Sequence, residues 1–332
     1  MPIGPVTNSH REISVTEPVG PALEWVKMVL FRPFDLGKWF TIGFCAWLAY
    51  LGESGGGLNG NFNHGNAFKH DSSGQPGQSF RDFYDQARDF IMSNLYWIVP
   101  VAVVTIIILV SLWLVILWLN SRGKFMFLHC VALNRAEVVV PWNKFSRAAN
   151  SLFKFRMVLG LAGLILLLPL LAVIGISIIG MCLRGEPDVA GILTAVGFGI
   201  LFLFFVILFA LIQKFTTDFV VPVMFLRGTE CGAAWREFYG LLSTNPGKFT
   251  LYILFQIVLG MAIGVIIIAA VLVTCCIAGC LMVIPYIGTV VLLPVLIFQR
   301  SYSLYFLKQY GVAYDVFLTA PPSPGLQPAP IV

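Results

Sequence analysis

The sequence predicts an all-α, polytopic membrane protein, a helix bundle with about six transmembrane helices. The first observation is compositional: 58% of the 332 residues are hydrophobic, 11% are charged, and the mean hydropathy is +0.87. Globular domains carry about 25% charged residues, so one water-soluble core could not bury this much apolar surface. The second observation is a series of long uncharged stretches, and the third is an uneven distribution of lysine and arginine.

Uncharged stretches of about 20 apolar residues can cross the ~30 Å hydrocarbon core of a membrane as helices. Five stretches qualify, namely residues 95–119, 157–182, 189–212, 249–274 and 277–298. A sixth stretch, residues 39–51, is short. It spans the membrane only if the flanking Gly37, Lys38 and Gly52 are included, so a re-entrant placement or a thinner bilayer is the alternative.

The basic residues predict the orientation of these spans. With six spans, the N-terminus, two loops and the C-terminus share one side, which holds 17 of the 21 lysine and arginine residues. The other side holds Lys69, Arg81, Arg88 and Arg184. Because cytoplasmic loops carry the excess of positive charge, we expect both termini in the cytoplasm and the protein in the cytoplasmic membrane of the cell. The basic residues adjoin the spans and form no separate basic domain, so the net charge of +5 does not predict nucleic-acid binding.

A local pattern occurs three times and predicts a threefold internal repeat. A tryptophan stands twelve or thirteen residues ahead of a lysine–aromatic pair, and an apolar stretch follows each pair. The copies are Trp25 with Lys38-Trp39, Trp142 with Lys154-Phe155, and Trp235 with Lys248-Phe249. A second echo, an aromatic-rich tetrapeptide, follows at residues 125–128, 223–226 and 304–307. Each unit would be an amphipathic helix on the cytoplasmic face followed by a two-helix hairpin, and chance similarity is the alternative.

The pattern divides the chain into one membrane domain with flexible ends. The domain covers residues 21–318, with repeat units at about 21–133, 134–228 and 229–311. Residues 52–94 are an extracytoplasmic insertion, in which a polar, Gly-rich part precedes an amphipathic helix at 79–93. Residues 1–20 form a flexible N-terminal segment, and residues 319–332 form a proline-rich flexible tail.

Three equivalent lysines are the candidate lipid-headgroup ligands. Lys38, Lys154 and Lys248 each stand at the predicted cytoplasmic interface, where an ammonium group can meet anionic phosphates. The associated tryptophans, Trp25, Trp142 and Trp235, are suited to the same headgroup layer. We therefore predict membrane lipids as partners of the protein. The alternative is that the lysines only fix the topology.

Other residue types give weaker candidates. Cys182 could form a disulfide with Cys275, Cys276 or Cys280 on the outer side, although cysteine also serves as a small apolar residue between helices. His64 and His70 lie in a Gly-rich loop without further ligands, so we predict no metal site and no cofactor. Asp218 follows the fourth span and is either an interfacial charge or part of a cytoplasmic-side cavity.

The chain resembles a broad group of bacterial six-span membrane proteins, and the membrane region fused to some glycerophosphodiester phosphodiesterases. The residues that carry the resemblance are Trp25 with Phe34-Asp35-Leu36-Gly37-Lys38-Trp39, Trp235-Arg236-Glu237-Phe238 with Lys248-Phe249, and Asp218-Phe219-Val220-Val221-Pro222. The resemblance covers roughly residues 20–311. It implies an all-helical, polytopic fold. It gives almost no activity to transfer to this chain.

The function predicted from these observations is non-enzymatic, either a membrane scaffold or a lipid-interacting protein. The five plain spans hold no charged residue at mid-depth, which disfavours ion-coupled transport. An uncoupled permease for a lipid-like or small uncharged solute is the alternative. A membrane-embedded enzyme is the third hypothesis, and its only acidic candidates are Asp218 and the loop residues Asp82, Asp85 and Asp89.

Overall fold

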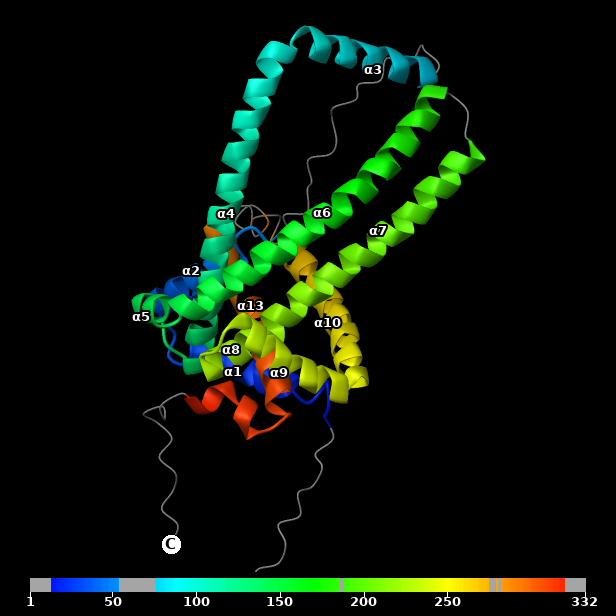
Figure 1. The fold of residues 1–332 in the computed structure, drawn as a ribbon. Helices are drawn as coiled ribbons and strands as arrows, with labels where there is room; N and C mark the ends of the chain where they lie inside the picture. Colours follow the sequence, from blue (N-terminus) through cyan, green and yellow to red (C-terminus); the bar gives the residue numbers. More distant parts are fainter. Residues whose placement is uncertain are drawn as a thin grey trace, which may run out of the picture. The chain divides into compact units, whose positions relative to one another are not determined.

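The computed structural model describes residues 13–53, 76–184, 188–274, 279, 282 and 284–319, and all regular structure within them is helical. The order is α1 (Val19–Phe31), α2 (Leu36–Tyr50), α3 (Pro76–Ser93), α4 (Leu95–Leu133), α5 (Val139–Lys144), α6 (Ser146–Arg184), α7 (Val189–Phe215), the π-helix η1 (Thr216–Val220), α8 (Val221–Arg227), α9 (Cys231–Thr244), α10 (Pro246–Val273), α12 (Pro285–Val291), α13 (Leu293–Lys308) and the 3₁₀ turns η2 (Val312–Tyr314) and η3 (Val316–Thr319) (Figure 1). The all-α prediction is confirmed for the described residues.

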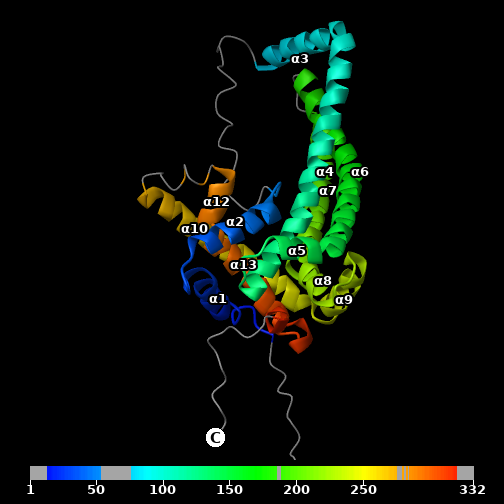
Figure 2. The same cartoon turned by 90° about the vertical axis from the view of Figure 1, so that its left-hand side faces the viewer.

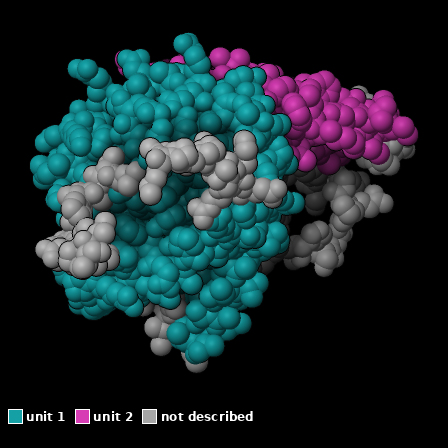
Figure 3. Space-filling view, turned by 90° about the horizontal axis from the view of Figure 1, so that it is seen from below, with its two compact units in different colours: residues 1–58, 119–152, 216–332 teal, residues 59–118, 153–215 magenta. Residues whose placement is uncertain are grey.

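The chain forms two compact units, coloured separately in Figure 3. Unit 1 comprises residues 1–58, 119–152 and 216–332, and unit 2 comprises residues 59–118 and 153–215. Unit 2 contains α3, α7 and the long apolar stretches of α4 and α6. Within it, Gly160 of α6 lies against Trp113 of α4, and Gly163 of α6 lies opposite Phe209 of α7. These small residues let the long helices approach one another, as in other membrane bundles.

Four helices in the described part of the chain are long and apolar enough to cross a membrane: Leu95–Leu133, Ser146–Leu183, Val189–Arg227 and Pro246–Val273. A helix of 28 residues is about 42 Å long and one of 39 residues about 58 Å, so each exceeds the ~30 Å hydrocarbon core. None of the side chains of α7 is buried in the protein, as expected of a helix that faces lipid. Four of the six predicted spans therefore have spanning length, and the chain is that of a multi-pass membrane protein.

The other two predicted spans do not form helices long enough to cross a membrane in the described residues. Residues 39–51 fall in α2, whose 15 residues extend only about 22 Å. Residues 277–298 fall partly outside the described residues, and the rest is divided between α12 and α13. Both of these short helices have a proline in the first turn, and a proline cannot continue the hydrogen-bond ladder of a preceding helix. Among the residues that the structure describes, the prediction of six spans is thus corrected to four helices of spanning length.

The short helices of unit 1 pack on one another around a shared core. α1 lies on α13, and α12 lies on α2 (Figure 2). The π-helix η1 contacts α8, α9 and α13, and its Phe219 stacks on Phe238 with ring centroids 5.2 Å apart. Phe249 and Phe306 complete this buried aromatic group. The core therefore joins segments that lie far apart in the sequence.

The helix α2 packs antiparallel to the C-terminal part of α4. The Asn120 side-chain amide donates to the carbonyl oxygens of Ala49 (2.8 Å) and Leu51 (2.9 Å), whereas Cys130, further along α4, meets Cys45, earlier in α2. At the end of α2, Glu53 forms an ion pair of 2.7 Å with Lys124. The six-span topology assigns Glu53 and Lys124 to opposite sides of the membrane. Because these two side chains are in contact, they cannot lie on opposite sides of the membrane. The ion pair therefore supports the same correction, that α2 is not a full span.

The predicted cytoplasmic-face helices are present as α1 with Trp25, α5 with Trp142 and α9 with Trp235. α1 buries Ala22, Val26 and Val29, residues that share the side of the helix packed in unit 1. Their position on a membrane face stays a prediction, and so does the threefold repeat. The predicted helix at 79–93 is confirmed as α3. Residues 54–75, with His64 and His70, lie outside the described residues, as does most of both flexible ends.

Candidate functional site

The first candidate site is a buried charged network in unit 1, centred on Lys124 of α4. This side chain is only 5% exposed. Its ammonium group forms the ion pair with Glu53 and donates to the Thr217 hydroxyl oxygen at 2.6 Å. A charge buried in an apolar protein is costly to desolvate unless it is paired and hydrogen-bonded. The contacts with Glu53 and Thr217 meet that requirement.

Arg300 of α13 approaches the same π-helix from another direction. Its guanidinium Nη1 donates to the Thr217 backbone carbonyl oxygen at 2.6 Å. Its Nη2 is buried and has no hydrogen-bond partner in the part of the chain that the structure describes. Burial lowers the pKa of Arg300, and the nearby Asp218 carboxylate opposes that shift. Thr217 thus binds two cations, Lys124 through its hydroxyl and Arg300 through its carbonyl.

Asp218 extends the network into α10. Its Oδ2 accepts a hydrogen bond of 3.0 Å from the Tyr252 hydroxyl, which in turn accepts one of 2.9 Å from the Gln256 side-chain amide. Asp218 is buried, so it is not the solvated interfacial charge that was one of the two sequence interpretations. The network contains two cations, Lys124 and Arg300, and two carboxylates, Glu53 and Asp218. Its formal charge is balanced.

The π-helix η1 explains how one short segment can accept hydrogen bonds from both Lys124 and Arg300. A π-turn holds one residue more than an α-turn, and such turns are frequent at functional sites. In η1 the extra residue lies at the junction between the apolar α7 and the buried α8, where Thr216, Asp218, Phe219 and Val220 are all buried. The segment therefore presents a hydroxyl, a carbonyl and a carboxylate to three different helices.

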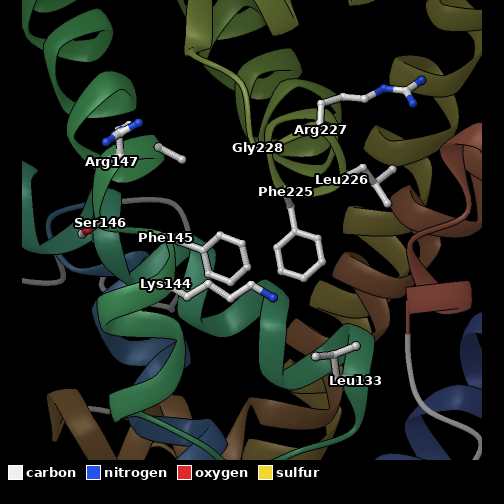
Figure 4. A pocket seen from close by; sticks show the side chains of 10 residues that line it. Leu133, Lys144, Phe145, Ser146, Arg147, Phe225, Leu226, Arg227 and Gly228 are labelled. Carbon is white, nitrogen blue, oxygen red and sulfur yellow. The ribbon is translucent and has the colours of Figure 1, made fainter.

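The second candidate site is an open cavity of about 670 Å³ in unit 1 (Figure 4). It is lined by Leu133, Lys144, Phe145, Ser146, Arg147, Ala148, Phe225, Leu226, Arg227 and Gly228, and we call it the basic pocket. Three of the lining side chains are cationic and none is acidic. Phe145 and Phe225 stack with centroids 4.7 Å apart, and Lys144 lies 5.3 Å from the centre of the Phe145 ring. The pocket thus combines an aromatic wall with positive charge.

Neighbouring residues affect the net charge of the basic pocket. Arg227 forms an ion pair of 3.0 Å with Glu237 of α9, so one of the three cations is partly neutralised. His129 is buried behind the aromatic wall, with its ring 6.0 Å from Phe145 and 6.3 Å from Phe225. Lys144 and Arg147 remain exposed. The net charge presented to a ligand is therefore positive, and the pocket size lies within the range of small-ligand sites.

A sequence model described as a family of unknown function, DUF7544, matches residues 13–287. The chain belongs to DUF7544. No curated protein and no solved structure matches the chain. The DUF7544 match includes every residue of the basic pocket and all of the charged network except Arg300. No comparison links the chain to glycerophosphodiester phosphodiesterases, so that resemblance stays a prediction.

The three lysines predicted to bind headgroups within this DUF7544 match have different surroundings. Lys38 is half-buried and donates to the Asn134 side-chain oxygen at 2.7 Å. Lys154 is exposed and belongs to unit 2, whereas Lys248 is half-buried in the first turn of α10 in unit 1. Their role in lipid binding stays a prediction.

The three tryptophans of the DUF7544 match pack against protein groups. The Trp25 indole donates to the Val131 carbonyl oxygen at 2.9 Å. Trp142 lies under the Arg122 guanidinium, 4.6 Å from its ring centre, and Trp235 packs edge-on against Phe238. Each of the three rings therefore contacts another group of the protein. A role of these rings in the headgroup layer stays a prediction.

The cysteine and metal predictions fall partly outside the described residues. Cys182 is an exposed free thiol, and its three predicted partners, Cys275, Cys276 and Cys280, are not among the described residues, so the pairing stays a prediction. Within the described ranges no group of three or more His, Cys, Asp or Glu side chains is placed to hold a metal ion.

Sequence reasoning singled out Asp218, as an interfacial charge or part of a cavity, and missed the other members of both sites. Lys124, Arg300 and the cations of the pocket were treated as topology charges because each stands near the end of an apolar stretch. One signal was available: Lys124, Asp218 and Arg300 each precede a copy of the aromatic-rich tetrapeptide by one to five residues. The network therefore draws one segment from each predicted repeat unit.

Proposed function

We propose that the protein is a non-enzymatic, multi-pass membrane protein that binds anionic phospholipid headgroups in the basic pocket. The observation that carries this proposal is the arrangement of Lys144, Arg147 and Arg227 around the Phe145–Phe225 wall. All three cations are exposed, and Lys144 and Arg147 can meet a phosphate without breaking the Arg227–Glu237 ion pair. An aromatic wall beside them suits the glycerol and upper acyl region of a lipid.

The place of the pocket in the chain supports the same proposal. Its residues come from the segments 119–156 and 213–248, which lie on one side of the membrane with either four or six spans. These two segments contain 11 lysine and arginine residues. Within about 20 residues of the opposite ends of the four long helices, the described chain holds only Arg81, Arg88 and Arg184. Positive-inside bias therefore favours a cytoplasmic location, next to the leaflet that carries anionic lipids.

Native mass spectrometry of the detergent-solubilised protein tests the proposal. The pocket variant is Lys144→Gln/Arg147→Gln/Arg227→Gln, and the matched control is Lys38→Gln/Lys154→Gln/Lys248→Gln, which removes the same charge. The probes are phosphatidylglycerol, phosphatidylcholine and inorganic phosphate.

We expect the wild type and the control to retain phosphatidylglycerol in preference to phosphatidylcholine. The pocket variant should bind phosphatidylglycerol about 100-fold more weakly, because each basic residue near a membrane surface contributes about 1 kcal/mol. Equal retention by the wild type and the pocket variant would overturn the proposal. Loss in the control triple alone would move the site to the three predicted lysines. Competition by millimolar inorganic phosphate would indicate a free-phosphate site.

A second function, uncoupled passage of a small solute, is favoured by the charged network. Its polar groups form two runs, Glu53–Lys124–Thr217 and Asp218–Tyr252–Gln256, which meet at the adjacent residues Thr217 and Asp218. Stopped-flow light scattering of proteoliposomes, with glycerol as the probe, tests this alternative. Glycerol entry faster than in protein-free liposomes, and slowed by Gln256→Leu, would support it. Identical traces with and without protein would exclude glycerol-sized solutes.

A further inference from the structure

Two buried thiols meet at the contact of α2 with α4. Cys45 and Cys130 are both 0% exposed, and both belong to the apolar core of unit 1. The Cys130 thiol donates toward the Cys45 sulfur, with the two Sγ atoms 3.7 Å apart. The Glu137 carbonyl oxygen, 3.4 Å from the Cys130 Sγ, is a second acceptor. Neither cysteine belongs to the charged network or to the basic pocket.

The neighbouring contacts fix this meeting point. On the same side of α4, Asn120 bonds to the end of α2, and Gly123 lets the Leu48 and Ala49 backbone approach so closely that an added Cβ would overlap it. One turn before Cys130, the Phe127 ring packs against Tyr50 at 6.1 Å between centroids. The sulfur contact therefore lies in a helix crossing held at several points and does not depend on a loop.

We propose that Cys45 and Cys130 are a reversible oxidation site that forms a disulfide tying α2 to α4 when the protein meets a small uncharged peroxide. A disulfide needs the sulfur atoms about 2.05 Å apart, so they must approach by about 1.7 Å. Rotation about the Cα–Cβ bonds can supply part of that movement. The oxidant must be small and uncharged because both sulfur atoms lie away from water.

The chemistry follows the ordinary thiol oxidation ladder. One thiol loses its proton, and its sulfur attacks a peroxide oxygen. The O–O bond breaks, a sulfenic acid forms, and the proton leaves with the hydroxide as water. The second thiol then attacks the sulfenic sulfur, the S–O bond breaks and the S–S bond forms. The released hydroxide takes the second proton and leaves as water. In total the two thiols lose two electrons and two protons, and one hydrogen peroxide becomes two waters.

The test uses the full chain with its other five cysteines replaced by alanine, at Cys182, Cys231, Cys275, Cys276 and Cys280. The detergent-solubilised protein is treated with hydrogen peroxide, unfolded, reacted with N-ethylmaleimide and weighed intact. We expect the mass to fall by two hydrogens and both maleimide additions to be lost. Dithiothreitol should restore both additions. The Cys45→Ala variant of this background should form no intramolecular disulfide.

Three results would overturn the proposal: two maleimide additions after peroxide treatment, conversion to sulfinic acids, or a disulfide between two chains. If the five-alanine background does not fold, the wild-type protein is treated in the same way and digested with protease. A peptide pair linked through Cys45 and Cys130, absent from the Cys130→Ala variant, is then the expected result. Linkage of Cys45 or Cys130 to another cysteine would overturn the proposal in that protein too.

Discussion

At the scale of single residues, two lysine–glutamate pairs of unit 1 illustrate how burial changes the contribution of an ion pair to stability. Lys27 and Glu24 are 51% and 66% exposed, and their ion pair of 2.8 Å lies on the surface of α1. Lys124 is almost completely buried, and Glu53 is 29% exposed. Water can replace the partner of a surface charge but cannot reach the buried ammonium group. The two pairs have similar lengths and should have very different effects on stability.

We predict that Glu53→Gln lowers the unfolding free energy by about 3 kcal/mol, because it removes a carboxylate that faces a buried cation. The matched control Glu24→Gln should leave stability unchanged. Intrinsic tryptophan fluorescence during thermal unfolding in detergent measures both. Equal unfolding midpoints for the two variants would mean that Lys124 does not need the charge of Glu53.

Cys231 provides a second prediction at this scale. Burial raises the pKa of its thiol to about 12, against about 8.5 for an ordinary cysteine. The thiolate is the reactive form, and at pH 8 only about one molecule in 10,000 would carry it. A variant whose only cysteine is Cys231 should therefore resist N-ethylmaleimide at pH 8 in the folded protein and react once the protein is unfolded. A variant with only the exposed Cys182 should label readily at pH 8. Rapid labelling of folded Cys231 at pH 8 would contradict its burial.

At the scale of the elements, Gly123 sets the distance between α2 and α4. An alanine there would place its Cβ within the backbone of Leu48 and Ala49, whereas an alanine at Gly240 of α9 would meet no atom within 4 Å. We predict that Gly123→Ala destabilises the protein by about 1–3 kcal/mol through overpacking. Gly240→Ala should be neutral or stabilising, because alanine favours the helix. The same fluorescence measurement applies, and a stable Gly123→Ala variant would show that α2 can move away from α4.

The elements also show what local sequence can predict. Length and hydropathy identified α4, α6, α7 and α10, because an apolar helix that faces lipid is specified by its own residues. The same criterion failed for α2 and for α12 with α13. Their apolar side chains pack against one another in unit 1, and a short buried helix has the composition of a short span.

At the scale of the whole molecule, the membrane orientation gives the next prediction. If the segment 119–156 is cytoplasmic, Cys182 at the far end of α6 should face the outside of the cell. A membrane-impermeant maleimide should then label a Cys182-only variant in intact cells. A cysteine-free protein with Arg147→Cys should label only after the membrane is permeabilised. The opposite pattern would invert the orientation and place the basic pocket outside the cytoplasm.

Neither candidate site could be derived from the sequence alone. Thr217 lies 93 residues from Lys124 and 83 residues from Arg300, and only the folded unit 1 shows that they meet. In the same way, Arg227 at the end of α8 joins Lys144 of α5 and Arg147 of α6 around one pocket. The sequence supplied the sign of these charges and the side of the membrane expected for them. Their partners depend on long-range packing, which no local pattern encodes.

The π-turn at Thr216–Val220 sets the direction in which the side chains after it point. The turn holds one residue more than an α-helical turn would hold. Removal of one residue between Phe215 and Val221 would turn the following side chains by about 100° about the helix axis. Asp218 would then no longer meet Tyr252. The length of this segment, and not only its composition, is therefore required for the hydrogen bond between Asp218 and Tyr252.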